Sequence, residues 1–286
     1  MQAPPTVCFG ACGATLDIDN VKECRLSDHV LAVSSNPNIE QAAVPCVEMP
    51  AEQISGPVLV VSAHPDDVDF GAGGTVAALT SSGVKVSYCI VTDGAQGALD
   101  SSIAPVDLVA LRQTEQRAAA KTLGVDEVRF LGYPDGSLEP TRELRRDFTR
   151  VIRSAKPRSI ICQSPERHWG RIHASHPDHL AAGEALIRSV YPDSRNPFSY
   201  PELLEEGLEP HVVEEVWLMA SPHPTTAVDV TETFELKIAA LRCHESQLGS
   251  AGGLSEMVRG WLQENAVRSG LGEGRLAEAF QVVDTR

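Results

Sequence analysis

The chain has 286 residues, of which 42% are hydrophobic and 22% are charged. This composition is typical of a globular protein and argues against disorder over most of the length, and this size favours one large domain with appendages. The 39 acidic residues outnumber the 24 basic residues and give a formal net charge of -15, which argues against nucleic acid as a partner because its phosphates would be repelled.

The lack of a recognisable targeting signal and the cysteine content both favour a reducing compartment. The sequence has no apolar run of about 18 residues, the length that a membrane span needs. Its first residues also lack the basic start and apolar stretch of a signal peptide. The seven cysteines are an odd number, which favours reduced thiols over disulfides. We therefore expect a cytoplasmic protein without a membrane span.

The pattern changes near residue 55. Residues 1–54 are irregular, with scattered proline and glycine, and we expect an N-terminal extension of unknown role there, followed by the functional domain over 55–286. "PVLVVSA" at 57–63 is a continuous apolar run typical of a strand buried on both faces. The next segment, 71–82, is predicted as a helix that ends before Gly83.

Strands and helices alternate in the residues that follow. Further strands are predicted at 84–92, 127–133 and 158–164, with helices at 107–123 and 140–155. This alternation predicts βαβ units with right-handed crossovers. The expected fold class is therefore α/β, a Rossmann-like three-layer sandwich with a mostly parallel, twisted sheet. The apolar stripe of the helix over 107–123 is expected to contain Leu108, Leu111, Glu115, Ala118, Ala119 and Leu123.

The last third of the chain is predicted in less detail. A helix is expected at 178–191, a strand at 212–221, and a helix at 231–246 with Thr231 as its N-cap. "GSAGGLSEM" at 249–257 is expected to form a flexible loop before a final helix.

Charged motifs follow several of the predicted strands. "HPDD", "TDG", "YPDG" and "SPERHWG" all fall where a strand is expected to end, and ligands of parallel sheets bind at that edge. His64 and Asp67 offer a nitrogen and an oxygen, both sound ligands for zinc. A catalytic zinc also needs a third protein ligand and a position for water.

The segment "HASHPDHLAAG" at 173–183 offers that third ligand. His176 and His179 lie three residues apart at the opening of a predicted helix, so both imidazoles can face one cavity. A single HPD triplet is more often a turn followed by a helix cap. Two such motifs, each mixing histidine with carboxylates at a strand end, together indicate a metal site.

The motifs taken together identify a family resemblance. With "AHPDD" and "GAGGT" after the first strand, then "TDGAQG", "YPDGSL", "HPDH" and "KIAALRCHESQ", residues 57–248 resemble the PIG-L/LmbE family of zinc-dependent de-N-acetylases. Members of this family remove acetyl groups from N-acetylglucosaminyl substrates. The resemblance implies one zinc ion per chain, bound by His64, Asp67 and His179.

Catalytic roles follow from the same resemblance. It implies Asp66 as the general base, His176 as the group that stabilises the oxyanion and donates a proton, and Asp178 as the partner that orients His176. Amide hydrolysis requires such a set, namely an activated water, a base, an oxyanion stabiliser and a proton for the departing amine. Zinc lowers the pKa of its bound water to about 7 and polarises the carbonyl.

Four further residues are candidates for substrate contacts, and three of them have a simpler alternative. Asp93 either supports the site or caps a turn. Arg112 either reaches sugar hydroxyls or forms a surface ion pair with Glu115. Trp169, in the loop before "HPDH", offers a surface on which a sugar can stack. His244 either contacts substrate or only packs in the core.

A glycine cluster leaves a different class of function open. Gly71, Gly73 and Gly74 resemble half of a dinucleotide-binding fingerprint, but the full G-x-G-x-x-G is missing. Our preferred interpretation is that these glycines let the first helix approach the sheet closely.

The sequence therefore predicts a zinc-dependent hydrolase that removes an N-acetyl group from an N-acetylglucosamine-type amino sugar or its conjugate. Its partner is a small N-acetylated sugar, and the number of subunits stays open. One alternative is an amidase for a sugar-linked thiol conjugate or a natural-product intermediate. Another is a non-catalytic nucleotide or carbohydrate binder.

Overall fold

The computed structural model describes residues 47–48, 50, 53–98, 100, 102–249 and 252–286. The expected N-terminal extension, 1–54, lies almost entirely outside these residues, so its boundary and role stay predictions. The four cysteines among residues 1–46 lie outside them as well.

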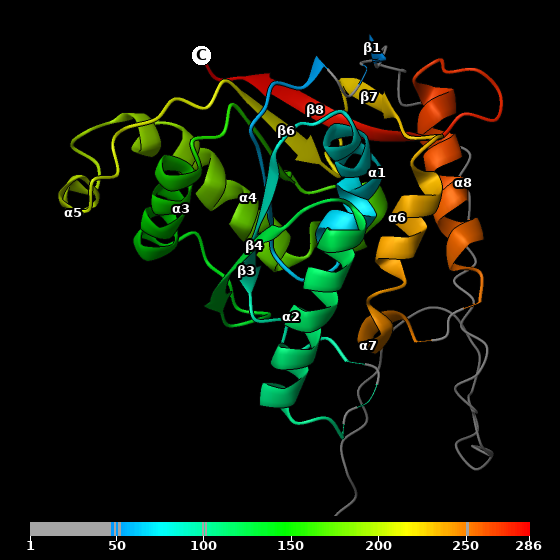
Figure 1. Ribbon diagram of the computed structural model, residues 1–286, viewed down its shortest axis with the longest axis horizontal. Helices are drawn as coiled ribbons and strands as arrows, with labels where there is room; N and C mark the ends of the chain where they lie inside the picture. The colour runs from blue at the N-terminus through cyan, green and yellow to red at the C-terminus, as the bar shows by residue number, and fades with distance from the viewer. Residues whose placement is uncertain (1–46, 49, 51–52, 99, 101, 250–251) are drawn as a thin grey trace, which may run out of the picture. The chain divides into compact units, whose positions relative to one another are not determined.

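One mostly parallel sheet forms the centre of the described part of the chain (Figure 1). Its eight described strands lie in the order β1-β7-β8-β6-β5-β2-β3-β4. Only β8 runs antiparallel to its neighbours, β6 and β7. The predicted α/β class is confirmed, whereas β7 and β8 were not predicted. The strands are β1 (Val47–Glu48), β2 (Val58–Ser62), β3 (Val86–Thr92), β4 (Glu127–Tyr133), β5 (Ser159–Gln163), β6 (Glu215–Met219), β7 (Thr226–Asp229) and β8 (Ala277–Asp284).

Helices cover both faces of the sheet and complete the three layers (Figure 1). Val58 and Val60 of β2 pack into the core beneath α1, α2, α6 and α8, whereas Leu59 and Val61 pack into the core beneath α3 and α4. The apolar run at 57–63 is therefore buried on both sides, as predicted. The helices are α1 (Asp67–Ser81), α2 (Pro105–Thr122), α3 (Arg142–Ala155), α4 (Pro177–Val190), α5 (Pro201–Glu205), α6 (Phe234–Leu241), α7 (Glu245–Leu248) and α8 (Leu254–Arg268), with 3-10 turns η2 (Trp169–Ser175) and η3 (Asp193–Arg195).

Helix α1 begins at Asp67, four residues before the predicted start at 71. The predicted start was too late, and the glycines lie inside the helix. At two of them a side chain would not fit. A Cβ on Gly71 would lie 2.6 Å from Met219 Sδ, and one on Gly74 would lie 2.7 Å from Val230 Cβ. The glycines thus serve close packing against the sheet, as preferred from the sequence, and do not form a phosphate-binding turn.

The C-terminal part of the chain departs most from the prediction. Helix α6 begins after Thr233, and Thr231 instead bonds to Asp229 through its backbone N–H and its hydroxyl. The predicted helix at 231–246 is two helices, because the chain turns at 242–244 before α7. Helix α8 begins at Leu254, inside the segment predicted as a loop.

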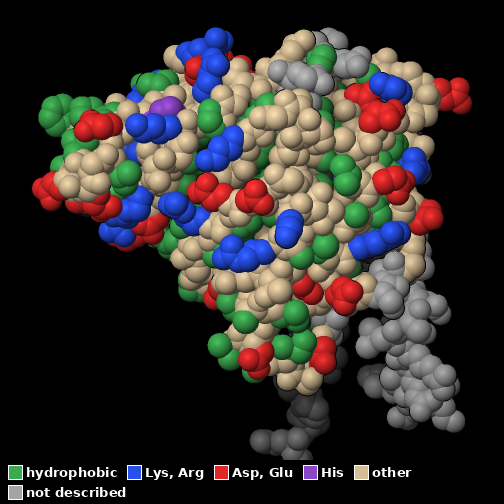
Figure 2. Space-filling view, viewed as in Figure 1, with side chains coloured by type: hydrophobic (Ala, Val, Ile, Leu, Met, Phe, Trp, Pro, Cys, Tyr) green, Lys and Arg blue, Asp and Glu red, His purple; other side chains and the backbone are tan. Residues whose placement is uncertain are grey.

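The helices, thiols and surface charges are those that the composition led us to expect. No helix in the described ranges is long and apolar enough to cross a membrane. Cys89, Cys162 and Cys243 are free thiols, and the first two are buried in β3 and β5. Figure 2 shows basic and acidic side chains interspersed over one face of the molecule, without a continuous basic surface.

Candidate active site

The charged motifs meet at the carboxyl edge of the central strands. Strand β2 lies between β3 and β5, and the chain passes directly from its end through His64 and Asp66 into α1. His179 lies in the first turn of α4. Although 115 residues separate His64 from His179, His64 Nδ1 lies 3.3 Å from His179 Nε2.

Two imidazoles and one carboxylate form a compact donor set. His64 Nδ1 lies 3.2 Å from Asp67 Oδ2, and His179 Nε2 lies 3.1 Å from Asp67 Oδ1. Ligands held at about 2.0–2.2 Å from a tetrahedral metal stand roughly 3.4 Å apart. The donor types and separations therefore fit a borderline divalent cation such as zinc. His176 also offers a nitrogen within 4.8 Å of His64 and His179 donor atoms.

Electrostatics at this donor set favour a positive charge. Burial disfavours a charged imidazole, but hydrogen bonds with Asp135 and Asp67 outweigh burial and raise the pKa of His64 to about 11. Burial acts against ionisation of Asp67 too, yet His179 and His64 hold the pKa of Asp67 well below its ordinary value. Surroundings that favour a proton on His64 Nδ1 favour a metal cation there for the same reason.

The other ring nitrogen of His64 is fixed by two carboxylates. Its Nε2 lies 3.1 Å from Asp135 Oδ1 and 3.2 Å from Asp178 Oδ2. The Asp178 carboxylate is itself held by the backbone N–H groups of Gly136 (2.7 Å) and Leu138 (3.1 Å). A proton on Nε2 leaves the Nδ1 lone pair free for a metal, which is how carboxylates commonly orient a metal-binding histidine.

Asp178 and His176 depart from their expected pairing. The Asp178 carboxylate contacts His64, and only the backbone N–H of Asp178 bonds to His176, at Nδ1 (3.2 Å). Burial, and next the positive charges of His64 and His179, lower the pKa of His176. Since Nδ1 accepts a hydrogen bond, the neutral ring carries its proton on Nε2.

Asp66 immediately precedes α1 in a strained conformation. Its φ is 85°, a region that costs a residue with a side chain roughly 1–3 kcal/mol. Its Oδ2 lies 3.3 Å from Arg112 Nη2. Burial, and next the Asp67 carboxylate, raise the pKa of Asp66 to about 7, although Arg112 acts in the opposite direction. A carboxyl group with a pKa near neutrality is well suited to general base catalysis.

Arg112 and Asp93 both bond to the protein backbone. Arg112 is buried and donates to the carbonyl oxygens of Pro65 (3.0 Å) and Gly94 (2.8 Å), so the alternative of a surface ion pair with Glu115 is wrong. Asp93 Oδ1 accepts hydrogen bonds from Ala95 N–H and Asp135 N–H. It therefore caps the turn and also supports Asp135.

His244 and Trp169 have opposite environments. His244 is fully buried and its Nε2 lies 2.8 Å from Asp69 Oδ2. The expected substrate contact of His244 is therefore corrected, because no part of the ring is open to a ligand. Trp169 is 81% exposed in η2, and the Arg167 guanidinium lies 5.6 Å above its ring.

The sequence did not single out two residues that the site uses. Asp135 contacts His64, and Gln116 contacts Asp66. A third, Asp69, was expected only as an acidic residue at the start of the first helix, where it lies, and its contact with His244 was not predicted. Asp135 is the acidic residue of "YPDG", a motif that the sequence placed at the correct edge of the sheet, so the signal for it was available. Gln116 carried no such signal, because it lies within a helix whose buried polar face depends on the tertiary fold.

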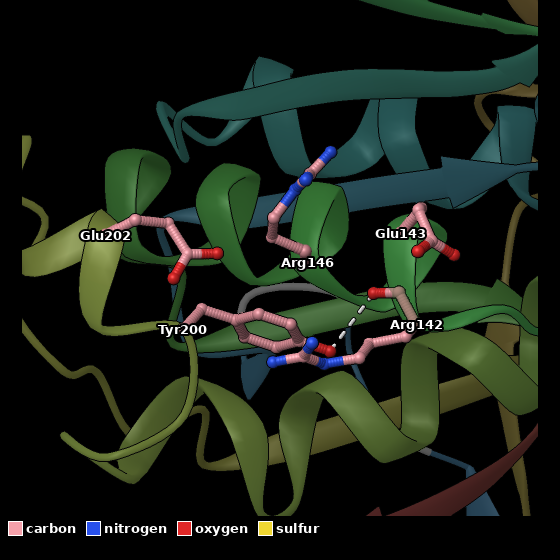
Figure 3. Close-up of a pocket in the computed structure, with 5 residues that line it drawn as sticks. All are labelled: Arg142, Glu143, Arg146, Tyr200 and Glu202. Carbon is pink, nitrogen blue, oxygen red and sulfur yellow. Dashed lines mark hydrogen bonds between the residues drawn. The ribbon is translucent and has the colours of Figure 1, made fainter.

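A small cavity lies apart from this donor set. It has a volume of about 40 Å³ and is lined by Arg142, Glu143, Arg146, Tyr200 and Glu202, none of which belongs to the site (Figure 3). The Tyr200 hydroxyl donates to the Arg142 carbonyl (3.1 Å), and the Arg142 guanidinium stacks over the Tyr200 ring. Its volume is below the range of typical ligand pockets, about 300–1,000 Å³.

Comparisons with known proteins agree with this geometry. Residues 59–190 match the family model described as PIG-L: GlcNAc-PI de-N-acetylase. Diacetylchitobiose deacetylase from Thermococcus kodakarensis is 35% identical over 190 residues, which cover 66% of this chain and 69% of that protein. A probable N-acetyl-alpha-D-glucosaminyl L-malate deacetylase 2 from Bacillus cereus is 31% identical over 197 residues, which cover 66% of this chain and 83% of that one. The solved structure of N,N'-diacetylchitobiose deacetylase from Pyrococcus horikoshii matches with a TM-score of 0.74 and 32% identity, covering 80% of this chain and 84% of that chain.

Proposed function

The chain belongs to the PIG-L family of de-N-acetylases, and from this premise we propose that it hydrolyses the N-acetyl group of an N-acetylglucosamine-type amino sugar or its conjugate, with one zinc ion per chain. The observation that carries the proposal is the donor set of His64, Asp67 and His179. The two imidazole nitrogens lie 3.3 Å apart, and each lies 3.1–3.2 Å from a different carboxylate oxygen of Asp67. Asp66 lies directly beside Asp67, where a base is needed.

The substrate class rests on the names of the relatives. The relative from Thermococcus kodakarensis is named for diacetylchitobiose and that from Bacillus cereus for an N-acetylglucosaminyl malate. The shared chemical part is an N-acetylglucosaminyl unit, while the attached group differs. We therefore assign the acetamido sugar to the reaction centre and leave the attached group to experiment, with sugar-linked thiol conjugates and natural-product intermediates among the candidates.

The residues divide the reaction between them. Zinc, when bound, supplies a Lewis acid that polarises the amide carbonyl and makes an attacking water more acidic. The Asp66 carboxylate takes the proton of the attacking water and delivers it to the departing nitrogen. Arg112 holds Asp66 Oδ2 in place from 3.3 Å.

His176 stabilises the negative charge that develops on the carbonyl oxygen. Its ring centroid lies 4.9 Å from that of His64 and 5.4 Å from that of His179, so it borders the donor set. Its Nδ1 is occupied by the Asp178 N–H, which leaves the Nε2 proton for the oxyanion. A neutral donor aimed at developing charge is sufficient for this role.

An amine-release assay tests the proposal. Zinc-loaded protein is incubated with N-acetylglucosamine, N,N'-diacetylchitobiose and N-acetylglucosaminyl malate, and free primary amine is measured. We expect release that chelator abolishes and added zinc restores. Asp66→Asn should lower kcat by about 10²–10⁴-fold, whereas Asp126→Asn, the same change at an exposed position, should not. No amine from any substrate with zinc-loaded protein would overturn the proposal.

A further inference from the structure

The backbone at Asp66 needs an external restraint. With φ at 85° and ψ at -30°, Asp66 adopts a conformation that residues with a Cβ rarely occupy. The first residues of α1 and the carboxylate of the proposed base both depend on this geometry. Relaxation to negative φ would rotate the peptide that joins Pro65 to Asp66 and would redirect the Asp66 side chain.

Two residues of α2 hold the two sides of that one peptide. The Pro65 carbonyl accepts a hydrogen bond from Arg112 Nη2 at 3.0 Å, and the Asp66 N–H donates to Gln116 Oε1 at 2.7 Å. Arg112 and Gln116 are four residues apart and therefore lie on the same face of the helix. Rotation of the peptide would break both hydrogen bonds at once.

Gln116 is in turn fixed by a buried pair behind it. Its Nε2 donates to Asp69 Oδ2 at 3.0 Å, and His244 Nε2 lies 2.8 Å from the same oxygen. Gln116, Asp69 and His244 are all 0% exposed. The amide can adopt only one orientation here, because the Asp66 N–H needs an acceptor and the Asp69 carboxylate needs a donor.

We infer that Gln116 is a positioning residue that fixes the Pro65–Asp66 peptide and so aims the Asp66 carboxylate, and that Asp69 and His244 act by fixing the Gln116 amide. The inference rests on the proposed function, in which Asp66 is the base. None of these three supporting side chains bonds to His64, Asp67 or His179 among the described contacts. Their loss should therefore reduce turnover without removing the metal or weakening sugar binding.

A purely structural role makes a different prediction. If the chain His244–Asp69–Gln116 only satisfied buried polar groups, its loss would lower the melting temperature and leave the kcat of the folded protein unchanged. The distinguishing measurement is therefore kcat against KM in folded, zinc-loaded protein, with metal content recorded for each variant.

The first test replaces the amide of Gln116. Gln116→Met keeps the length of the side chain and removes both hydrogen bonds, and Gln113→Met makes the same change one turn earlier on α2, at a half-buried position. We expect Gln116→Met to retain one zinc per chain and a KM within about twofold, while kcat falls about a hundredfold because the base is misplaced. Gln113→Met should match wild type. Wild-type kcat in Gln116→Met, or loss of its zinc, overturns the inference.

The second test addresses the residues behind Gln116. His244→Phe removes the donor to Asp69 and should lower kcat, whereas His244→Gln retains a donor and should restore it. The double variant Gln116→Met with His244→Phe should be no slower than the slower single variant, because both act through one side chain. If the two losses in kcat multiply in the double variant, Gln116 and His244 act independently and the inference is overturned. Should Gln116→Met not fold, the His244 pair decides alone, and equal kcat in wild type and both His244 variants overturns the inference.

A crystal structure separates this inference from the proposed function. We expect positive φ at Asp66 in the wild type and a rotated Pro65–Asp66 peptide in Gln116→Met or, if that variant does not fold, in His244→Phe. An unrotated peptide overturns the positioning role even if the enzyme is active. A rotated peptide in a protein that releases no amine from any substrate supports the restraint and overturns the proposed function alone.

Discussion

Lys237 and Glu278 lie in contact at 1% and 2% exposure, whereas His64, Asp67 and His179 are 11–16% exposed at the edge of the sheet. Lys237 Nζ uses all three of its protons, on Glu278 Oε1 and on the carbonyl oxygens of Asp69 and Phe70 within α1. This first cluster is balanced in charge and saturated with hydrogen bonds.

The cluster around His64 is neither balanced nor saturated. Four aspartates (Asp66, Asp67, Asp135 and Asp178) lie at or beside the donor set, and the permanently charged Arg112 contacts two of them, Asp66 and Asp135. Buried charge that lacks a partner is costly, so this edge of the fold is stable only with an additional positive charge, either protons on the histidines or a metal ion. The contrast separates a cluster that builds the scaffold from one that is built to bind a cation.

Removal of a metal ligand should have the largest effect on activity. His179→Ala deletes one of three donors, and we expect amine release to fall to background, a greater loss than the roughly 10²–10⁴-fold expected for a missing base, because the metal is lost as well. Zinc content per chain should fall with it. His173→Ala, at an exposed position in η2, is the matched control and should keep both. A His179→Ala variant with full zinc content would contradict the assignment.

Breaking the scaffold cluster should lower stability instead. Lys237→Met leaves the Glu278 carboxylate buried without its counter-ion, and we expect a loss of about 3–5 kcal/mol in the free energy of unfolding, or roughly 10 °C in melting temperature. Adding Glu278→Gln should recover part of this loss, because the buried charge is then gone. Thermal unfolding followed by circular dichroism measures both. An unchanged melting temperature in Lys237→Met would remove the distinction between the clusters.

Zinc itself should stabilise only through the second cluster. A ligand present at a hundred times its Kd stabilises the folded state by about 2.7 kcal/mol. We expect zinc added to chelator-treated protein to raise the melting temperature of wild type and of Lys237→Met by similar amounts. His179→Ala should show little or no rise. Equal shifts in all three proteins would indicate that zinc binds elsewhere.

The sequence predicted the edge of the sheet at which these residues gather. Buried strands and alternating helices gave a parallel sheet, and the rule that ligands bind at its carboxyl edge placed the two HPD motifs near one another, whereas the choice of His64, Asp67 and His179 as ligands came from the family resemblance. Contiguous motifs made this possible, because each motif follows a strand or opens a helix directly. Strand β7 was missed because it has only four residues, and strand β8 was missed because it runs antiparallel to both neighbours, outside the alternation of parallel strands with helices.

The contacts between side chains could not be predicted from the sequence. The predicted apolar stripe of α2 included Leu111, which is 40% exposed, while Arg112 and Gln116 are buried in its place. Periodicity assumes that the buried face of a helix is apolar, whereas this part of α2 covers the polar turn between β2 and α1. For the same reason the contact of the Asp178 carboxylate with His64, across 114 residues of chain, was not predicted.

The smallest expected effect concerns the pH dependence of stability at His244. Burial disfavours the charged ring, but the hydrogen bond and charge of Asp69 outweigh it, aided by Asp66 and Glu115, and raise the pKa of His244. A folded pKa above the unfolded value of about 6.5 gives a stabilisation that is complete below that pH and is lost as the pH rises through the folded pKa. His244→Gln cannot titrate, so the free energy of unfolding of wild type should exceed that of the variant most at about pH 6 and least at about pH 9. Urea unfolding of chelator-treated protein measures this difference, and a difference that stays constant across the range would show that His244 is neutral in the fold.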